Sequence, residues 1–494
     1  MKKSVPKLRV AILALACCLC LLLNTNNSDL YGRRYQITRT VNHFFVSITP
    51  NYKTLNLTVK HPETLRRQQI VEDEELDVSC AGRYVYMYHL PSKFNDDVIK
   101  NCSTLIKWFD MCPSMANSGL GPKVVDYTNR VLTGTGSWYA TNQFLLEVIF
   151  RERMKHYECL TNDSSLASAI YVPFYAGFDV SRYLWDTTVT VRDRLGEELA
   201  KWLSERPEWM RLYGRDHFLV SGRIAWDFRR VSDEDSGWGN KLMRLPELAN
   251  TTMLSIEATA WENDIAIPYP TYFHPTSESE VTRWQRKVKK TKRRFLFSFV
   301  GAPRPTMEES VRGEIIRQCL ASQGRCNFLN CSETKDCENP VKVMEVFQDS
   351  VFCLQPQGDS ATRRSIFDSI LAGCIPVFFH PASAYNQYTW YFPEDHTKYS
   401  VYIPEEYLRN RTVSIEESLV KVNQKKIREM REEVVRLIPK IIYKKPRPVR
   451  PVKDAFEIAV GRIIERVAKV KKEIEEGRDP QAEFSQNRDL SKLR

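Results

Sequence analysis

The sequence predicts an α/β protein of two Rossmann-like domains that face a cleft, preceded by an N-terminal membrane anchor. At 494 residues, 43% of them hydrophobic, the chain is too long for one typical domain and apolar enough to fold. Two successive blocks alternate short apolar strands with helical patterns, which is typical of layered domains with mostly parallel sheets. An apolar run also follows a short basic N-terminus.

That apolar run, from Val10 to Leu23, predicts the anchor. It is shorter than the roughly 17–25 residues of most spanning helices, so a cleaved signal peptide is the alternative. No small-residue cleavage pattern follows it, and the basic residues before it favour a cytosolic N-terminus. We therefore expect a cytosolic tail at 1–9, a transmembrane signal anchor at 10–23 and a polar lumenal stem at 24–78.

N-glycosylation acceptors support a lumenal location for the rest of the chain. They occur at Asn26, Asn56, Asn101, Asn162, Asn250, Asn330 and Asn410. Of 13 cysteines, Cys17, Cys18 and Cys20 lie in the anchor, which leaves ten, an even number that suits disulfides. The spacing of four of these ten could suggest a zinc site, but no CxxC pair or histidine lies nearby. We therefore expect disulfides, whose pairing the sequence leaves open. The four are Cys319, Cys326, Cys331 and Cys337.

An N-terminal, acceptor-side α/β domain is expected at 79–282. Its strand candidates are Arg83–Tyr88, Ala169–Phe174, His217–Ser221 and Met253–Ile256, with a helix over Asn142–Tyr157. The basic, glycine-free segment 283–293 is expected to be a linker. No nucleic-acid-binding motif accompanies the net charge of +11, so no nucleic-acid partner is expected.

A C-terminal, nucleotide-sugar-binding α/β domain is expected at 294–412, followed by helices and a tail at 413–494. Ser414 and Glu417 form a capping box that predicts a helix running towards Arg436, and a last amphipathic helix is expected at 453–476. The elements expected within the domain are strands at Arg294–Val300, Val351–Gln355 and Cys374–Phe379 and helices at Glu308–Cys319 and Arg363–Ala372.

The polar segment from Gln357 to Asp368 gives the strongest sign of a ligand site. A buried strand ends in a glycine turn, and two arginines open the following helix. Backbone N–H groups, the positive helix end and guanidinium groups at one place suit a nucleotide diphosphate. Asp368 could accept hydrogen bonds from the ribose. Alternatively, Arg364 and Asp368 form an ordinary i, i+4 surface pair, which contributes about 0.3–0.5 kcal/mol.

Several ordered motifs resemble the exostosin family, glycosyltransferase family 47, over about residues 79–465. They are Arg83 to Asn95, Gly214 to Phe218, Arg294 to Arg304 and Gly358 to Val377. Three more look like the plant branch that contains the xyloglucan galactosyltransferases of the Katamari or Murus type. These are Tyr171 to Gly177, Trp226 to Arg230 and Pro268 to Pro275.

The resemblance implies a GT-B fold, a single-pass type II protein of the Golgi membrane, and inverting transfer of β-galactose from UDP-galactose to xylosyl side chains of xyloglucan. Other wall-polysaccharide transferases are expected partners. Cationic and dipolar groups would stabilise the departing UDP, so neither a metal nor another cofactor is expected. The implied donor-binding residues are Gln357, Gly358, Ser360, Arg363, Arg364, Ser365 and Asp368, with Arg304 a further phosphate ligand.

Inverting transfer needs a base that takes the proton of the acceptor hydroxyl. The candidates in the first domain are Asp227, Asp216, His217 and Asp179, and we prefer Asp227 because aromatic and basic residues surround it. Asp227 could instead be a salt-bridged structural residue, and His217 a core histidine. Asp233-Glu234-Asp235 is similar to a metal-binding element of other glycosyltransferases, but it does not follow an apolar strand, so no metal role is expected.

Three alternatives stay open at this point. Sister activities would transfer galacturonic acid or a pentose such as arabinose, or would act on another hemicellulose such as mannan. A uronate donor would need a cationic partner for its carboxylate. The chain could also be a non-catalytic polysaccharide-binding or scaffolding member of the family.

Overall fold

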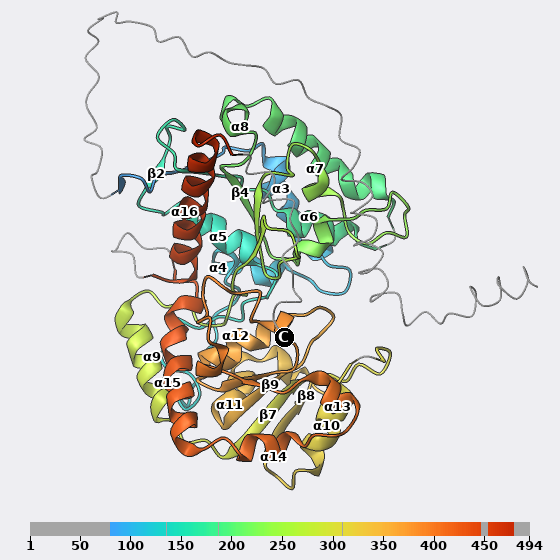
Figure 1. Ribbon diagram of the computed structural model, residues 1–494, viewed down its shortest axis with the longest axis vertical. Helices are drawn as coiled ribbons and strands as arrows, with labels where there is room; N and C mark the ends of the chain where they lie inside the picture. The colour runs from blue at the N-terminus through green and yellow to red at the C-terminus, as the bar shows by residue number, and fades with distance from the viewer. Residues whose placement is uncertain (1–79, 135, 186, 309, 446–452, 479–494) are drawn as a thin grey trace, which may run out of the picture. The chain divides into compact units, whose positions relative to one another are not determined.

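The computed structural model describes residues 80–134, 136–185, 187–308, 310–445 and 453–478 (Figure 1). The predicted cytosolic tail, anchor and stem therefore lie outside the described residues, as do Asn26 and Asn56. Within the described ranges, no helix combines the length and the apolar character that crossing a bilayer requires. All helices and strands discussed below belong to one compact unit.

The first sheet has six parallel strands in the order β2-β1-β3-β4-β5-β6. Strands β3 to β6 are buried along their whole length, as expected of parallel strands covered on both faces. The four predicted strands are confirmed, whereas β2 and β6 were not predicted. The bounds are β1 Val85–Met87, β2 Leu160–Thr161, β3 Ala169–Tyr171, β4 His217–Ser221, β5 Thr252–Ser255 and β6 Asp264–Ala266.

Alternate residues of the first sheet pack into two different hydrophobic clusters, because successive side chains of a strand point to opposite faces. Tyr171 and Phe218 join the cluster of α5 (Leu146–Met154) and of the C-terminal helix α16 (Ala455–Glu475). On the other face, Ile170 and Leu219 join the cluster of α6 (Ala176–Tyr183) and α7 (Val189–Ser204). The short helices α3 (Asp96–Lys100), α4 (Ala116–Gly119) and α8 (Pro207–Leu212) belong to the same part of the molecule. We call the first sheet and these helices the first lobe.

The second sheet has five parallel strands in the order β11-β10-β9-β7-β8. The strand order reverses between β7 and β9, since β8 lies beside one and β10 beside the other. The strands are β7 Phe295–Gly301, β8 Cys326–Asn330, β9 Ser350–Gln355, β10 Ile375–Phe378 and β11 Val401–Tyr402. The helices are α10 Arg312–Ala321, α11 Pro340–Gln348, α12 Arg364–Leu371 and α13 Glu405–Arg409. We call this sheet and these helices the second lobe.

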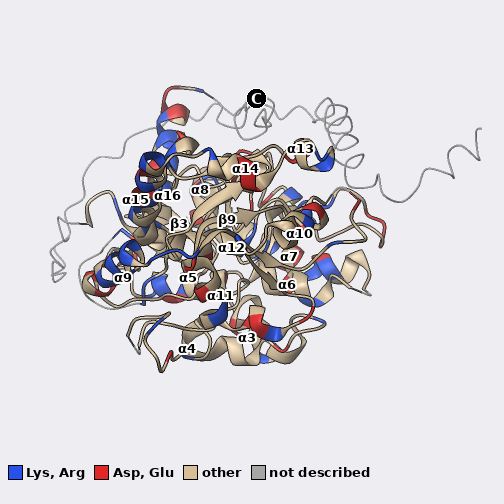
Figure 2. Ribbon diagram, turned by 90° about the horizontal axis from the view of Figure 1, so that it is seen from below, with Lys and Arg blue, Asp and Glu red and all other residues tan. Residues whose placement is uncertain are grey.

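The predicted linker at 283–293 is mostly helical, because α9 spans Glu278–Lys290. Its buried Trp284 donates from Nε1 to the backbone oxygen of Leu371 at 2.8 Å, which fixes α9 against the second sheet's helices. Figure 2 shows that basic residues occur along both α9 and the neighbouring helix α15 (Gln424–Ile441).

The predicted helix cap at Ser414 is confirmed, since its side chain accepts a hydrogen bond from the backbone nitrogen of Glu417. The prediction of a single helix from Ser414 towards Arg436 is wrong. Helix α14 (Ile415–Val420) ends after six residues, and Asn423 caps a new helix, α15 (Gln424–Ile441), by accepting from the nitrogen of Lys426. The last predicted helix is confirmed as α16, which returns to the first lobe and packs against β3.

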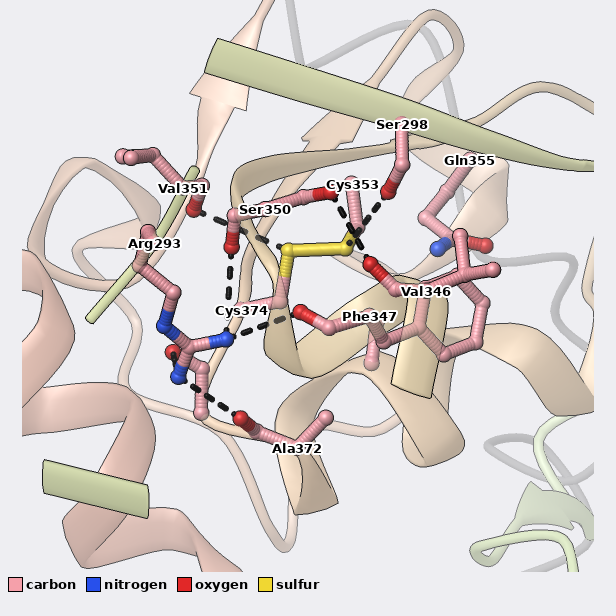
Figure 3. Close-up of a disulfide and its surroundings, with 12 residues drawn as sticks. Arg293, Ser298, Val346, Phe347, Ser350, Val351, Cys353, Gln355, Ala372 and Cys374 are labelled. Atoms are coloured by element: carbon pink, nitrogen blue, oxygen red, sulfur yellow. Dashed lines mark hydrogen bonds between the residues drawn. A yellow bond between two sulfur atoms is a disulfide. The ribbon is translucent and has the colours of Figure 1, made fainter. Parts of the chain in front are cut away.

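All ten cysteines beyond the predicted anchor form disulfides, which confirms the expectation for the cysteine-rich loop. Each bridge joins two residues of the same lobe. Figure 3 shows Cys353–Cys374, which links β9 to the residue before β10. The other pairs are Cys80–Cys159, Cys102–Cys112, Cys319–Cys326 and Cys331–Cys337.

Candidate active site

The loops that follow β7 and β9 adjoin the point where the strand order of the second sheet reverses. In open parallel sheets, ligands bind outside the carboxyl ends of the strands at such a point, because neighbouring loops diverge there. The predicted donor segment is the loop after β9, and Arg304 lies in the loop after β7. The fold therefore brings Arg304 close to the segment with which the family resemblance had grouped it.

A cluster of arginines lies where these two loops meet. Arg304 pairs with the exposed Asp359, with 2.9 Å between Nε and Oδ1. Arg312, the first residue of α10, donates from Nε to the backbone oxygen of Gln357 at 2.9 Å and from Nη1 to that of Ala302 at 3.1 Å. The buried Arg312 thus ties the two loops together. Sequence reasoning missed it, although it opens the helix after β7.

Arg363, the residue before α12, extends this arginine cluster. Its Nη2 donates to the backbone oxygen of Val300 at 3.0 Å, whereas the buried Nη1 has no hydrogen-bond partner among the described residues. A Cβ atom on Gly358 would lie 3.0 Å from Nη2 of Arg312 and 3.6 Å from Cγ of Arg363. Glycine at this turn therefore leaves room for the guanidinium group of Arg312 close to the backbone.

The arginine cluster, Arg304, Arg312 and Arg363, holds an excess of positive charge. Burial lowers the pKa of Arg363 to about 9, with further lowering by Arg312 and Arg304. Burial likewise lowers the pKa of Arg312 to about 10, again helped by Arg304. A bound anion would stabilise these charged forms, and the unpartnered N–H group of Arg363 suits a phosphate oxygen. We therefore identify the cluster as the candidate diphosphate site.

Arg364 connects α12 to the first lobe. Arg364 donates from Nη1 to the backbone oxygen of Thr141, and its guanidinium carbon lies 3.7 Å from the ring centre of Tyr272. Its Nε lies 3.2 Å from Oδ2 of Asp368. The i, i+4 pair is therefore present but buried, and burial raises the pKa of Asp368 to about 6. A ribose contact of Asp368 stays a prediction.

Glu257, two residues beyond β5, reaches from the first lobe to the loop between β9 and α12 (residues 356–363), which we call the donor loop. Its Oε2 accepts hydrogen bonds from Oγ of Ser360 at 2.8 Å and from both the nitrogen and Oγ1 of Thr362 at 2.7 Å. On the second lobe itself, Ser365 donates from Oγ to Oε1 of Gln355 at 2.6 Å, which joins the start of α12 to the end of β9. Glu257 thus holds the loop that precedes Arg363.

The backbone around Glu257 makes further contacts across the lobes. The nitrogen of Ala258 donates to Oε1 of Gln387 at 2.8 Å, and the hydroxyl of Tyr388 donates to the oxygen of Ile256 at 2.8 Å. Burial raises the pKa of Glu257, and the hydrogen bonds from Thr362 oppose that shift. A carboxylate with a raised pKa, at the carboxyl end of a strand and beside a candidate donor site, has the properties of a general base.

Asp227 lies in the 3-10 helix η6 (Ala225–Phe228) after β4, and its side chain is buried. Its Oδ2 accepts from Nε of Arg223 at 2.6 Å, and its Oδ1 accepts from Nε1 of Trp238 at 2.6 Å. Both carboxylate oxygens are thus engaged by neighbouring side chains. Arg229 pairs with Asp264 rather than with Asp227. These contacts favour a positioning role, and a role as base stays a prediction.

Asp216 and His217 lie at the amino end of β4, opposite to the strand ends that carry Glu257 and η6. The Nδ1 atom of the buried His217 lies 2.7 Å from Oδ1 of Asp216, and its Nε2 lies 3.0 Å from the hydroxyl of Tyr88. Both ring nitrogens therefore have partners within the first lobe. The geometry favours the core-histidine interpretation over the catalytic one.

The other acidic candidates also have local partners. Asp179 accepts from Nη2 of Arg182 at 2.7 Å, and burial raises its pKa to about 6. In the Asp233-Glu234-Asp235 segment, Oδ1 of Asp235 accepts from the nitrogen of Val189 at 2.7 Å, at the start of α7. Among the residues that the structure describes, no group of acidic, histidine or cysteine side chains is arranged to hold a metal ion.

The glycosylation acceptors within the described ranges differ in exposure. Asn101, Asn162 and Asn410 are exposed, and Asn330 is half-buried at the end of β8. Asn250 is buried, and its Nδ2 donates to the backbone oxygen of Tyr213 at 3.1 Å. A glycan on that nitrogen would have to displace this contact, so Asn250 is the acceptor least suited to modification.

Comparison with known proteins gives consistent matches. The Exostosin GT47 domain matches residues 79–419. The "Probable xyloglucan galactosyltransferase GT12" of Arabidopsis thaliana is 63% identical over 100% of this chain and 98% of that protein. "Xyloglucan galactosyltransferase MUR3" of the same plant is 53% identical over 81% of this chain and 64% of that protein. The "Xyloglucan-specific galacturonosyltransferase 1" of Arabidopsis thaliana is 42% identical over 79% of this chain and 58% of that protein.

Proposed function

Because this chain belongs to the exostosin GT47 family and is a glycosyltransferase, we propose that it moves β-galactose from UDP-galactose to the xylosyl side chains of xyloglucan, with inversion. The observation that carries the donor assignment is the arginine cluster at the reversal point of the second sheet. The xyloglucan galactosyltransferase names of the relatives that are 63% and 53% identical support the sugar and the acceptor. We further propose that the two lobes form a GT-B arrangement.

In the proposed reaction, the acceptor hydroxyl oxygen attacks the anomeric carbon of galactose. The bond from that carbon to the phosphate oxygen breaks, and UDP leaves with the electron pair. Arg363 and Arg304 stabilise the negative charge that develops on the leaving diphosphate. Neither a metal nor another cofactor takes part in this scheme, which an assay in a metal chelator would test directly.

Glu257 is the base that we propose, in place of Asp227. It belongs to the first lobe, contacts the donor loop through Ser360 and Thr362, and has a raised pKa. In this role it takes the proton of the attacking hydroxyl. Asp227 is the weaker candidate because Arg223 and Trp238 occupy both of its oxygens.

The test is transfer to xyloglucan oligosaccharides by the purified full chain, with UDP-galactose, UDP-galacturonic acid or UDP-arabinose as separate donors and mass spectrometry as the readout. We expect a hexose increment with UDP-galactose. A uronate increment would assign the sister activity named for the relative that is 42% identical, and a pentose increment would assign an arabinosyltransferase. A product only with mannan would change the acceptor, and no UDP binding at all would favour a non-catalytic scaffold.

We also propose that the protein is a single-pass type II protein of the Golgi membrane, with the catalytic lobes in the lumen. The apolar run at 10–23 and the glycosylation acceptors support this location. Protease protection of a C-terminal tag in intact Golgi vesicles would test it, since a lumenal tag is digested only after detergent is added. Co-purification from those vesicles would identify any other wall-polysaccharide transferase in complex with the protein.

A further inference from the structure

Three tryptophans from separate segments of the first lobe form a continuous ladder. The ring centres of Trp108 and Trp185 lie 5.3 Å apart, and those of Trp185 and Trp238 lie 5.1 Å apart, both in edge-to-face geometry. Trp108 is 68% exposed and Trp185 39% exposed, whereas Trp238 packs against the hydrophobic cluster of α6 and α7. The ladder thus runs from the edge of the core out to solvent.

The outer end of the ladder is held on a rigid turn. Trp108 lies inside the loop closed by the Cys102–Cys112 disulfide. Within this loop the nitrogen of Phe109 donates to the oxygen of Ile106 at 3.3 Å, which forms a tight turn around Trp108. Leaving indole rings in water forgoes about 25 cal/mol per Å² of apolar surface, so exposed aromatic patches usually mark binding sites. A fixed ring also loses little conformational entropy when a ligand binds.

The inner end of the ladder is connected to the candidate active site by hydrogen bonds. Nε1 of Trp238 donates to Asp227 at 2.6 Å. Asp227 lies in η6, whose first residue, Ala225, donates from its nitrogen to the backbone oxygen of Glu257 at 2.8 Å. Glu257 in turn contacts the donor loop at Thr362. The ladder therefore begins two short contacts away from the proposed base.

We propose that Trp108, Trp185 and Trp238 form a platform that binds the β-linked glucan backbone of the acceptor polysaccharide. This inference rests on the proposed function, because it names the acceptor-binding part of the same site. The faces of β-linked pyranose rings present C–H groups that pack well on the electron-rich face of an indole ring. A second protein is a poorer occupant, because a stable interface buries more than about 1,000 Å² in total, or about 500 Å² on each partner. Trp108 and Trp185 are only 68% and 39% exposed, and at about 150–250 Å² for a whole aromatic side chain their exposed parts supply less than that.

The test compares the full-length protein with its Trp108→Ala and Trp185→Ala variants. We expect KM for polymeric xyloglucan to rise at least about tenfold, with kcat and the KM for UDP-galactose unchanged, the pattern of lost uniform binding. Trp108→Phe, which keeps an aromatic face, should restore most of the affinity. Tyr127→Ala is the matched control, because Tyr127 is 93% exposed and belongs to no aromatic pair within the described residues. An unchanged KM for the polymer in both tryptophan variants would overturn the proposal.

A donor-free binding measurement separates this inference from the proposed function. Quenching of tryptophan fluorescence by xyloglucan should occur in the wild-type protein without UDP-galactose, and should be weakened in Trp108→Ala. If that result holds while no galactose is transferred, the platform stands and the galactosyltransferase assignment fails. If galactose is transferred but xyloglucan causes no quenching in the wild-type protein, the platform is wrong. Quenching by mannan oligosaccharides alone would also overturn the proposed β-glucan class of ligand.

Discussion

The Oε2 atom of Glu257 lies 2.7 Å from the backbone nitrogen of Thr362, and this contact joins two loops that follow the carboxyl ends of strands in different parallel sheets. The residue follows β5 in the first lobe, whereas its partner precedes α12 in the second. A single carboxylate oxygen thus receives three donors of the donor loop. Its role can be separated into holding the loop and accepting a proton, because glutamine retains the first ability and not the second.

Glu257→Gln should lower kcat by about 10²–10⁴-fold while UDP binding is preserved. The amide oxygen can still accept from Ser360 and Thr362, but it cannot act as a base. Glu257→Ala should lose UDP affinity as well, since the donor loop is no longer held. Single-turnover kinetics and titration calorimetry with UDP measure the two effects. A glutamine variant with wild-type kcat would restrict Glu257 to positioning.

Asp227→Asn should raise KM for xyloglucan with little change in kcat. The amide can keep one of the two hydrogen bonds to Arg223 and Trp238, so the platform end loosens while the reacting groups stay in place. Steady-state kinetics with varied acceptor checks this. A loss of kcat of about a hundredfold or more would return the role of base to Asp227.

Arg363→Ala should weaken UDP binding by about 10- to 100-fold, because a hydrogen bond to a charged group contributes about 1.5–3 kcal/mol. Calorimetric titration with UDP measures this. Arg317→Ala is the control, because Arg317 pairs with Glu314 on the exposed side of α10. Loss of affinity in Arg364→Ala but not in Arg363→Ala would instead place the phosphates against Arg364.

Acidification should destabilise the protein through the buried His274. Its Nδ1 donates to the oxygen of Tyr443 at 2.7 Å, and burial lowers its pKa from 6.5 to about 4. Between these pH values the unfolded chain binds a proton that the folded protein excludes. The contribution of neutral His274 to the free energy of unfolding is therefore fully present above pH 6.5 and is lost as the pH falls towards 4. Between pH 7.5 and 5.5 the loss is about 1 kcal/mol.

The measurement for His274 is urea unfolding at both pH values, for the wild-type protein and for His274→Gln. Buried acids such as Asp368 titrate in the opposite direction, so the informative quantity is the difference between the two proteins. The variant should lose less of its free energy of unfolding than the wild type on acidification. Equal losses in both proteins would show that His274 is not the responsible group.

Phe456→Ala should lower the free energy of unfolding by about 3–5 kcal/mol. The fully buried Phe456 lies 4.8 Å from the ring of Phe150, and Arg153 stacks on it at 4.8 Å. Ile474→Ala on the same helix is the control and should cost little, because Ile474 is 38% exposed. Chemical denaturation measures the free energy of unfolding of both variants. Equal losses in the two variants would mean that α16 is not anchored through Phe456.

The sequence was informative wherever a pattern is local. Four strands of the first sheet, the loop after β9 and the cap at Ser414 all follow from residues close together in the chain. The break at Asn423 was missed because one side-chain hydrogen bond decides it against a favourable helical pattern. The segment 283–293 was predicted to be a linker rather than a helix, because basic residues separate the few apolar residues of α9, such as Trp284.

The site was predictable only in part, because it depends on contacts between distant residues. Arg304 and the donor loop belong to recognisable motifs, but Glu257 and Thr362 are 105 residues apart and only the fold brings them together. Asp216 and His217 were candidates because they are titratable residues of the first domain. The strand end at which they lie, rather than their chemistry, separates them from the donor loop.

The return of α16 to the first lobe sets the order in which the nascent chain can mature. Translation completes the first sheet at β6, near residue 266, but the helix that covers the face carrying Tyr171 and Phe218 ends only at residue 475. At about 5–20 residues per second, the ribosome needs about 10–40 s to make the intervening chain. During that time the aromatic surface that α16 covers stays open to chaperones, and a premature stop before α16 leaves that surface uncovered. We therefore expect chaperones to recognise truncated chains at the first lobe, although the missing residues belong to the end of the chain.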